Sequence, residues 1–312
     1  MDFFTDKELI EKINRLRKEK HAVILAHNYQ LGEIQDIADF CGDSLELSIK
    51  AKNVNADMIV FCGVTFMAET AYILSPSKTV LLPNLGAGCL MADMLTGEDV
   101  RKMKAAHPGS VVLCYVNSTA EVKAESDICV TSANALEIAK SVAADKEILF
   151  VPDSNLGNYV MHKTGRKMTM FPGYCPTHMR LKKEDILARK KEFPDAKVII
   201  HPESRLEVIE LADEVLSTGG MCGYVKESDS RQFIIATESG ILHRLRRENP
   251  GKLLVPVSEE AVCYTMKMIR LIDLYNSLKK EEYKITVPED VRIKALRPIE
   301  KMLELSAHLN IR

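Results

Sequence analysis

Three of the eight cysteines stand at matching places along the chain and could share one metal centre. Each follows a polar residue that closes an apolar run, at a distance of 62, 60 and 62 residues; the pairs are His27 and Cys89, Tyr115 and Cys175, and His201 and Cys263. Three thiolates without a fourth protein ligand leave one coordination position open. A 4Fe-4S cluster could bridge cysteines from separate domains, and a zinc ion with three sulfurs and one water is the alternative.

The other five cysteines are expected to pack as small apolar side chains. Aliphatic residues stand at the positions of Cys41, Cys114 and Cys129 in at least one other repeat, and Cys62 lies within an apolar run. Cys222 has no cysteine counterpart in the other repeats. No CxxC motif occurs, which disfavours a zinc ribbon or a thioredoxin-like site. Thiols that stay reduced also make a disulfide framework a poor explanation.

A pair of polar residues with one residue between them follows each of three apolar runs. The pairs are His27 with Tyr29, Tyr115 with Asn117, and His201 with Glu203. If the strands continue through the pairs, both members of each pair face one side of the sheet. A histidine at a strand end alone could simply hydrogen-bond a carbonyl group. Recurrence in three copies instead indicates acid–base or hydrogen-bonding groups near the metal.

A hydroxyl residue recurs 17 positions after the first residue of each pair, at the expected start of a helix: Ser44, Ser132 and Thr218. Such residues are favoured helix caps, and "DSLE" offers a capping box with Glu46. A helix N-terminus with free amides and hydroxyls also binds phosphate or carboxylate. The two roles are compatible, and the spacing alone does not separate them.

The elements that position these residues form a threefold internal repeat. Short apolar runs alternate with helical patterns, which predicts parallel α/β units with right-handed crossovers. We therefore expect three homologous three-layer α/β domains with small parallel sheets, arranged by pseudo-threefold symmetry around a central active-site cavity. The expected repeats span residues 1–92, 93–178 and 179–266, and the tail, 267–312, is expected to pack back on the first repeat.

The amino-acid composition makes nucleic acids and membranes unfavoured binding partners. The 312 residues are 46% hydrophobic and 28% charged, as in an ordinary globular protein. Lys plus Arg (42) nearly balance Asp plus Glu (44), so no strong positive field favours nucleic acid or an anionic membrane. No apolar run reaches about 18 residues, and the first residues read as a charged amphipathic helix and not as a signal peptide. A cytoplasmic protein is the expectation.

From about residue 22 to the C-terminus, an ordered series of motifs resembles the quinolinate synthase family, the A protein of bacterial and archaeal NAD biosynthesis. The motifs are "AHNYQ", "GDSLELS", "FCGVTFMAETA", "AGCLMAD", "CYVNSTAEVKAESDICVTSANA", "VPDSNLGNYV", "GYCPTH", "HPES", "STGGM" and "ATESGILHRL", followed by the segment with the last cysteine. Two departures concern fine substrate geometry: "STGGM" replaces a Ser-Thr-Ser-Gly turn, and "AVCYTMKMI" lacks a proline after its cysteine.

The resemblance implies a 4Fe-4S cluster held by Cys89, Cys175 and Cys263, with the fourth iron open to substrate. The implied reaction condenses iminoaspartate with dihydroxyacetone phosphate to quinolinate, phosphate and two waters. An L-aspartate oxidase or dehydrogenase would supply the iminoaspartate.

Roles follow by position under this resemblance. His201 and Glu203 would move protons, and Tyr29 and Tyr115 would donate protons or orient the substrate. The remaining residues would bind substrate groups: His27 and Asn117 the carboxylates, and Ser44, Ser132, Thr218 and the neighbouring Thr131 the phosphate or a carboxylate. Three other readings compete: a zinc enzyme with an unrelated small anionic substrate, a redox or metal sensor, and a purely structural cluster.

Overall fold

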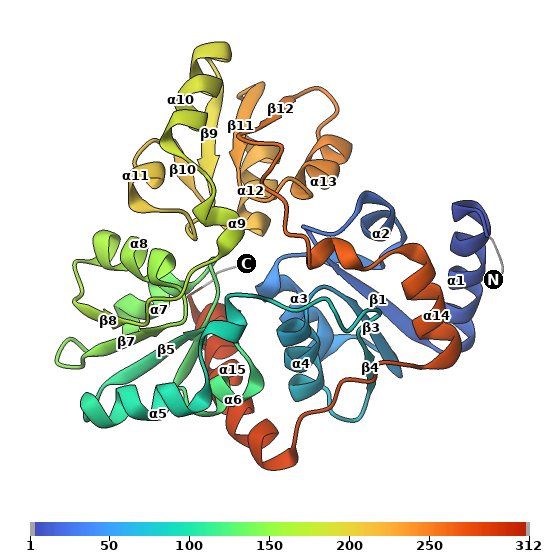
Figure 1. The fold of residues 1–312 in the computed structure, drawn as a ribbon, viewed down its shortest axis with the longest axis horizontal. Helices are drawn as coiled ribbons and strands as arrows, with labels where there is room; N and C mark the ends of the chain where they lie inside the picture. Colours follow the sequence, from blue (N-terminus) through green and yellow to red (C-terminus); the bar gives the residue numbers. More distant parts are fainter. Residues whose placement is uncertain (1–3, 310–312) are drawn as a thin grey trace.

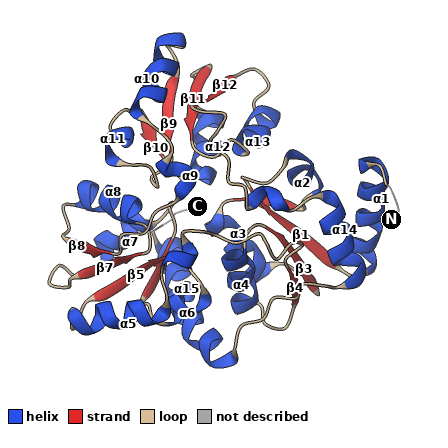
Figure 2. Cartoon of the chain, viewed as in Figure 1, coloured by secondary structure: helices blue, strands red, loops and turns tan. Residues whose placement is uncertain are grey.

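The computed structural model describes residues 4–309 as an α/β protein with three separate four-stranded sheets, and every strand pair within these sheets is parallel. Each sheet draws all its strands from one of the three expected repeats. Figure 1 shows the sheets and their helices as three lobes around a common centre, and Figure 2 shows that helices join the strands in each lobe. Residues 1–3 of the expected first repeat and 310–312 of the expected tail lie outside the described residues.

The first repeat contains one sheet, in the order β2-β1-β3-β4. Its elements are α1 (Asp6–Glu19), β1 (Ala22–His27), α2 (Gly32–Ile37), β2 (Phe40–Gly42), α3 (Ser44–Asn53), β3 (Met58–Cys62), α4 (Thr65–Leu74) and β4 (Thr79–Leu81).

The second repeat has the equivalent order, β6-β5-β7-β8. Its elements are the 3-10 helix η1 (Ala92–Met94), α5 (Gly97–Ala106), β5 (Val111–Tyr115), α6 (Ala120–Ala124), β6 (Ile128–Val130), α7 (Ala135–Ser141), β7 (Ile148–Val151), α8 (Ser154–Thr164), β8 (Met168–Met170) and α9 (Pro176–Met179).

The third repeat again gives one sheet, in the order β10-β9-β11-β12. Its elements are α10 (Lys183–Glu192), β9 (Lys197–Ile200), α11 (Leu206–Ile209), β10 (Glu214–Val215), α12 (Thr218–Glu227), β11 (Gln232–Ala236), α13 (Ile241–Glu248), β12 (Leu253–Pro256) and the 3-10 helix η2 (Met266–Met268). The tail adds α14 (Leu271–Lys280) and α15 (Glu289–His308).

The central strands are apolar along their whole length because helices cover both faces of a parallel sheet. All residues of β3 and β7 are buried, and β1 is buried after its first residue. The first edge strand of each sheet, β2, β6 or β10, has only two or three residues. The apolar runs in the sequence correctly predicted the other three strands of each sheet, but they did not predict these edge strands.

One backbone hydrogen bond recurs beside all three of the matched cysteines. In each repeat, an amide just after the second central strand donates to the carbonyl oxygen two residues before the cysteine. The bonds are Thr65 N to Ala87 O (2.9 Å), Ser154 N to Gly173 O (2.8 Å) and Ser239 N to Ala261 O (2.8 Å). The segment that carries each cysteine is thereby fixed to the carboxyl end of its own sheet.

The two tail helices pack on different repeats. Helix α14 lies against α1 and β3 of the first repeat. Helix α15 lies mainly against α6 and β6 of the second repeat and also contacts α4. It buries Ile299 and Met302, and the Asn134 side chain donates a 2.9 Å hydrogen bond to Oγ of Ser306. The prediction that the whole tail packs on the first repeat is therefore corrected for α15. None of the helices between residues 4 and 309 is long and apolar enough to cross a membrane.

Candidate active site

A cavity that is partly open to solvent lies where the three repeats meet. It collects nearly all the side chains that the sequence singles out, from strand ends and helix starts far apart in the chain. The predicted residues in its wall are His27, Tyr29, Ser44, Cys89, Tyr115, Asn117, Ser132, Cys175, His201, Glu203, Thr218 and Cys263. The carboxyl ends of parallel strands are the usual place for a ligand site in α/β folds.

Thr131 is the one predicted residue outside this wall. Its side chain is buried, and its hydroxyl oxygen accepts a 3.2 Å hydrogen bond from the Ala133 amide within the turn before α7. The adjacent Ser132 does line the cavity. Ser44 and Thr218 are the first residues of α3 and α12, while the capping hydrogen bonds come from the preceding residues, Asp43 and Ser217.

The polar pairs are positioned by turns and not by the pleat of a strand. Strand β1 ends at His27 and β9 ends before His201, so the second member of each pair lies beyond its strand. Nδ1 of His27 accepts the Tyr29 amide at 3.1 Å, and Nδ1 of His201 accepts the Glu203 amide at 3.4 Å. The expectation of a continued strand is wrong, but the turn still aims both members at the cavity.

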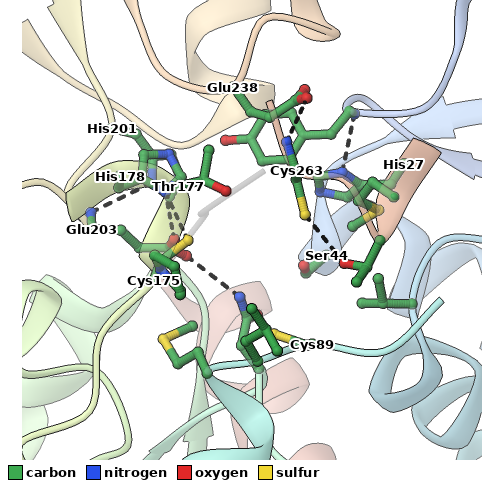
Figure 3. A pocket seen from close by; sticks show the side chains of 18 of the residues that line it. His27, Ser44, Cys89, Cys175, Thr177, His178, His201, Glu203, Glu238 and Cys263 are labelled. Atoms are coloured by element: carbon green, nitrogen blue, oxygen red, sulfur yellow. Dashed lines mark hydrogen bonds and ion pairs between the residues drawn. The ribbon is translucent and has the colours of Figure 1, made fainter. Parts of the chain in front are cut away.

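The three matched cysteines each offer a half-buried thiol to the same cavity, as Figure 3 shows. Burial raises the pKa of the Cys89 thiol to about 12, and burial together with the Glu203 charge raises that of Cys175. Buried thiols that face one another become stable thiolates when a bound cation compensates their charge. The donor set and its converging arrangement therefore fit a metal centre with three sulfur ligands.

The other five cysteines lie outside the cavity wall. Four are buried, and Cys41 is half-buried with its thiol 3.4 Å from Oδ1 of Asn28.

A second possible ligand set adjoins the cysteines. Ligand atoms of Cys175, His178 and Glu203 all lie within 4.8 Å of one another. Nδ1 of His178 is 2.8 Å from Oε2 of Glu203 and 3.2 Å from Sγ of Cys175. The close contacts among these three groups are equally those of a hydrogen-bonded acid–base unit.

A buried chain of hydrogen bonds connects groups from all three repeats. The Tyr29 hydroxyl lies 2.5 Å from Oγ1 of Thr237, and the same oxygen lies 2.8 Å from Nε2 of His178. The chain continues from Nδ1 of His178 to Glu203, which also accepts a 2.5 Å hydrogen bond from the Tyr115 hydroxyl. With Nδ1–H donating to Glu203, Nε2 accepts from Thr237, and Thr237 accepts from Tyr29. A proton can therefore pass from the phenol toward the carboxylate.

The electrostatics of the site keep Glu203 charged, and they keep His27, His201, Tyr29 and Tyr115 neutral. Burial raises the pKa of Glu203, but His178, His201 and the Tyr115 hydroxyl together lower it below its usual value. Burial lowers the pKa of both His27 and His201 to about 3. Burial and then the Glu203 charge raise the pKa of Tyr29 and Tyr115. At neutral pH, the Glu203 carboxylate is thus charged, the His27 and His201 imidazoles are neutral, and the Tyr29 and Tyr115 phenols are protonated.

Several residues of the site were not predicted as functional. His178 and Glu238 line the cavity, and Thr237 joins the hydrogen-bond chain. All three lie in quoted motifs, "GYCPTH" and "ATESGILHRL". His178 and Thr237 have no equivalent in the other two repeats, whereas Glu238 stands where the second repeat has the acidic Asp153. Their proximity to Cys175 and to the end of β11 was the available signal.

Three parallel α/β units around one cavity, with converging thiols and a buried hydrogen-bond chain, define an α/β protein with a candidate metal-binding and acid–base site. Comparison with known proteins then gives the family: the model of the quinolinate synthetase A protein family matches residues 11–304. The chain belongs to this family.

Three relatives, all named quinolinate synthase, illustrate the similarity. The protein of Dehalococcoides mccartyi (strain CBDB1) is 58% identical over 300 residues, which cover 96% of this chain and 99% of the relative. That of Desulforudis audaxviator is 52% identical and covers 96% and 98%. That of Methanosarcina barkeri is 52% identical and covers 95% and 97%.

Proposed function

We propose that this protein is a quinolinate synthase that condenses iminoaspartate with dihydroxyacetone phosphate and releases phosphate and two waters. The observation that carries the proposal is the single cavity in which three cysteines, the Tyr29–Thr237–His178–Glu203 chain and hydroxyls at helix starts converge. An L-aspartate oxidase or dehydrogenase supplies the iminoaspartate in this proposal.

The substrates are anions, and the cavity offers neutral donors for them. Ser44 and Thr218 present hydroxyls at the N-termini of α3 and α12, where the helix dipole favours phosphate or carboxylate. Ser132 adds a third hydroxyl. Nδ1 of His27 and of His201 each accepts an amide, so the neutral rings carry their proton on Nε2 and can donate it to a carboxylate.

The proton transfers are assigned to the buried chain. Condensation and loss of water require a base to take a proton from carbon and an acid to protonate a leaving oxygen. Tyr29 exchanges its phenol proton through Thr237 with His178, and Glu203 stabilises the imidazolium that forms. Tyr115, hydrogen-bonded to the same carboxylate, is a second proton donor.

Cys89, Cys175 and Cys263 are proposed to hold a 4Fe-4S cluster. When bound, such a cluster with three cysteine ligands supplies one iron with an open position, which acts as a Lewis acid. The chain's part is to hold three thiolates toward one point and to surround them with apolar side chains, including Val64, Phe66 and Met91.

The test is anaerobic purification of wild type and Cys175→Ala, with iron, acid-labile sulfide and quinolinate formation measured on the same samples. About four irons and four sulfides per wild-type chain with turnover, all lost in the variant, support the proposal. Zinc without sulfide favours the zinc enzyme, and a cluster-containing wild type without turnover favours a sensor or a structural cluster.

A mononuclear metal held by Cys175, His178 and Glu203 is the second candidate, because their ligand atoms lie within 4.8 Å of one another. Cys89→Ala and Cys263→Ala distinguish the two. Both variants lose iron and sulfide if the three cysteines share a cluster, whereas both keep one metal ion per chain if only Cys175, His178 and Glu203 bind it.

A further inference from the structure

Glu238, which lines the cavity, forms an ion pair with Lys267 that the proposed chemistry does not use. Nζ of Lys267 lies 3.0 Å from Oε1 of Glu238. The Glu238 side chain has no solvent exposure, and that of Lys267 is only 18% exposed. A buried ion pair contributes little net stability because desolvation offsets the attraction between the charges. Its contacts therefore suggest a role other than stability.

Both oxygens of the Glu238 carboxylate are bound to backbone amides of functional segments. Oε1 accepts a 3.1 Å hydrogen bond from the amide of Cys263, one of the three matched cysteines. Oε2 accepts a 2.7 Å bond from the amide of Gly240, in the turn before α13. Figure 3 shows Glu238 directly beside Cys263. The carboxylate thus fixes the backbone from which the Cys263 thiol projects.

Lys267 extends this unit to the first repeat. Its ammonium group also donates to the carbonyl oxygen of Tyr29, whose phenol begins the proton chain. The three groups approach closely only because residue 240 is glycine. A Cβ on Gly240 would lie 2.8 Å from both the Tyr29 oxygen and Oε2 of Glu238 and would collide with Nζ of Lys267. Gln35 supports the same junction through a 2.9 Å bond to the Gly240 carbonyl.

We propose that Glu238 and Lys267 are positioning residues that hold the Cys263 thiol and the Tyr29 phenol in one fixed relation. The inference rests on the proposed function for its substrate and cluster, and it adds a link between a cluster ligand of the third repeat and a proton donor of the first. Removal of a residue that is hydrogen-bonded to a metal ligand typically changes metal affinity or activity by about 10- to 100-fold.

The test compares Lys267→Met, Glu238→Gln and the double variant with Lys78→Met. Lys78 is the matched control because its ammonium also donates to backbone carbonyls, those of Val54 and Ala56 at 2.9 Å, and it does not line the cavity. Three quantities are measured anaerobically: the rate of iron release to a chelator, kcat and KM for quinolinate formation, and the thermal midpoint.

Lys267→Met is expected to release iron about 10-fold faster and to lower kcat about 10- to 100-fold, with a smaller change in KM. It also leaves the Glu238 charge buried and unpaired, which lowers the thermal midpoint. The double variant removes that charge, so its midpoint should recover while fast iron release and low kcat persist. Lys78→Met should change only the midpoint.

Wild-type rates of iron release and turnover in Lys267→Met would overturn the inference. Full recovery of both rates in the double variant would also overturn it, because Lys267 would then only neutralise Glu238. Gly240→Ala provides an independent check, since it displaces the same junction without removing either charge, and it should also accelerate iron release. If wild type makes no quinolinate, the proposed function fails, but iron release still tests the link to Cys263.

Discussion

The Tyr115 hydroxyl donates a 2.5 Å hydrogen bond to Oε1 of Glu203, across the junction of the second and third repeats. The same oxygen is 3.4 Å from Nδ2 of Asn117, and the other carboxylate oxygen faces His178. Glu203 is thus the point at which the acid–base groups of two repeats meet, and its protonation couples them.

Tyr115→Phe removes this bond without changing the size of the ring. A hydrogen bond to a charged group contributes about 1.5–3 kcal/mol, so we expect kcat to fall about 10- to 100-fold if Tyr115 acts on the reacting groups. The measurement is steady-state quinolinate formation. Tyr275→Phe is the control, because that ring is buried against Phe4 away from the cavity. An unchanged kcat in Tyr115→Phe would remove Tyr115 from the mechanism.

Thr237→Val tests the proton chain between Tyr29 and His178. Valine has nearly the shape of threonine but cannot relay a proton, so kcat should fall about 100-fold or more while the iron content stays unchanged. Thr70→Val is the control: Thr70 is equally buried, but its hydroxyl bonds only to the Phe66 carbonyl in its own helix. Full turnover in Thr237→Val would mean that Tyr29 exchanges its proton by another route.

Much of the fold follows from recurrence in the sequence. Apolar runs at matching intervals predict the three sheets, because strands buried on both faces must be apolar throughout. The edge strands β2, β6 and β10 were missed because their two or three residues lie just before hydroxyl residues that indicate helix starts. The equally short β4 and β8 were found because their apolar runs continue beyond the strand. The packing of α15 on the second repeat was missed because the apolar face of an amphipathic helix does not indicate which part of the protein covers it.

The residues of the site also divide into those that the sequence predicts and those that it does not. Residues that recur, such as Cys89, Cys175 and Cys263, could be predicted to share one site because they occur at nearly equal distances from the matching strand ends. His178 and Thr237 occur once, so a comparison between repeats overlooks them, although they complete the hydrogen-bond chain. In this protein, the repeated residues outline the cavity, and residues unique to one repeat connect its chemical groups.

Gly173→Ala should loosen the segment that carries Cys175. A Cβ at this position would lie 2.5 Å from the Pro152 carbonyl oxygen, a backbone atom that cannot rotate away. Overpacking of this kind costs about 1–3 kcal/mol, so the thermal midpoint should fall. Iron should also be released faster, because the Ser154 amide bonds to the Gly173 carbonyl two residues before the cysteine.

Gly223→Ala is the matched control for that substitution. Gly223 lies within α12, and a Cβ there would meet no atom of a neighbouring element within 4 Å, so alanine should stabilise the helix by up to about 1 kcal/mol. If Gly173→Ala behaves like this control in both measurements, the segment before Cys175 has more room than the structure shows.

The buried His201 should make the protein less stable as the pH falls. Burial lowers its folded-state pKa to about 3 from an ordinary value of 6.5, so between these values the unfolded chain binds more protons than the native one. The stabilisation is fully present above 6.5 and declines below it, by up to about 1.4 kcal/mol per pH unit.

His201→Gln should reduce this dependence, since glutamine does not titrate. The measurement is the free energy of unfolding in urea, taken anaerobically for both proteins between about pH 7 and pH 5.5. The difference between the two curves isolates His201 from groups such as Asp153, whose pKa burial raises and whose contribution has the opposite sign. Parallel curves would show that His201 is protonated as easily in the native protein as in the unfolded chain, and the neutral imidazole assigned to the cavity would have to be abandoned.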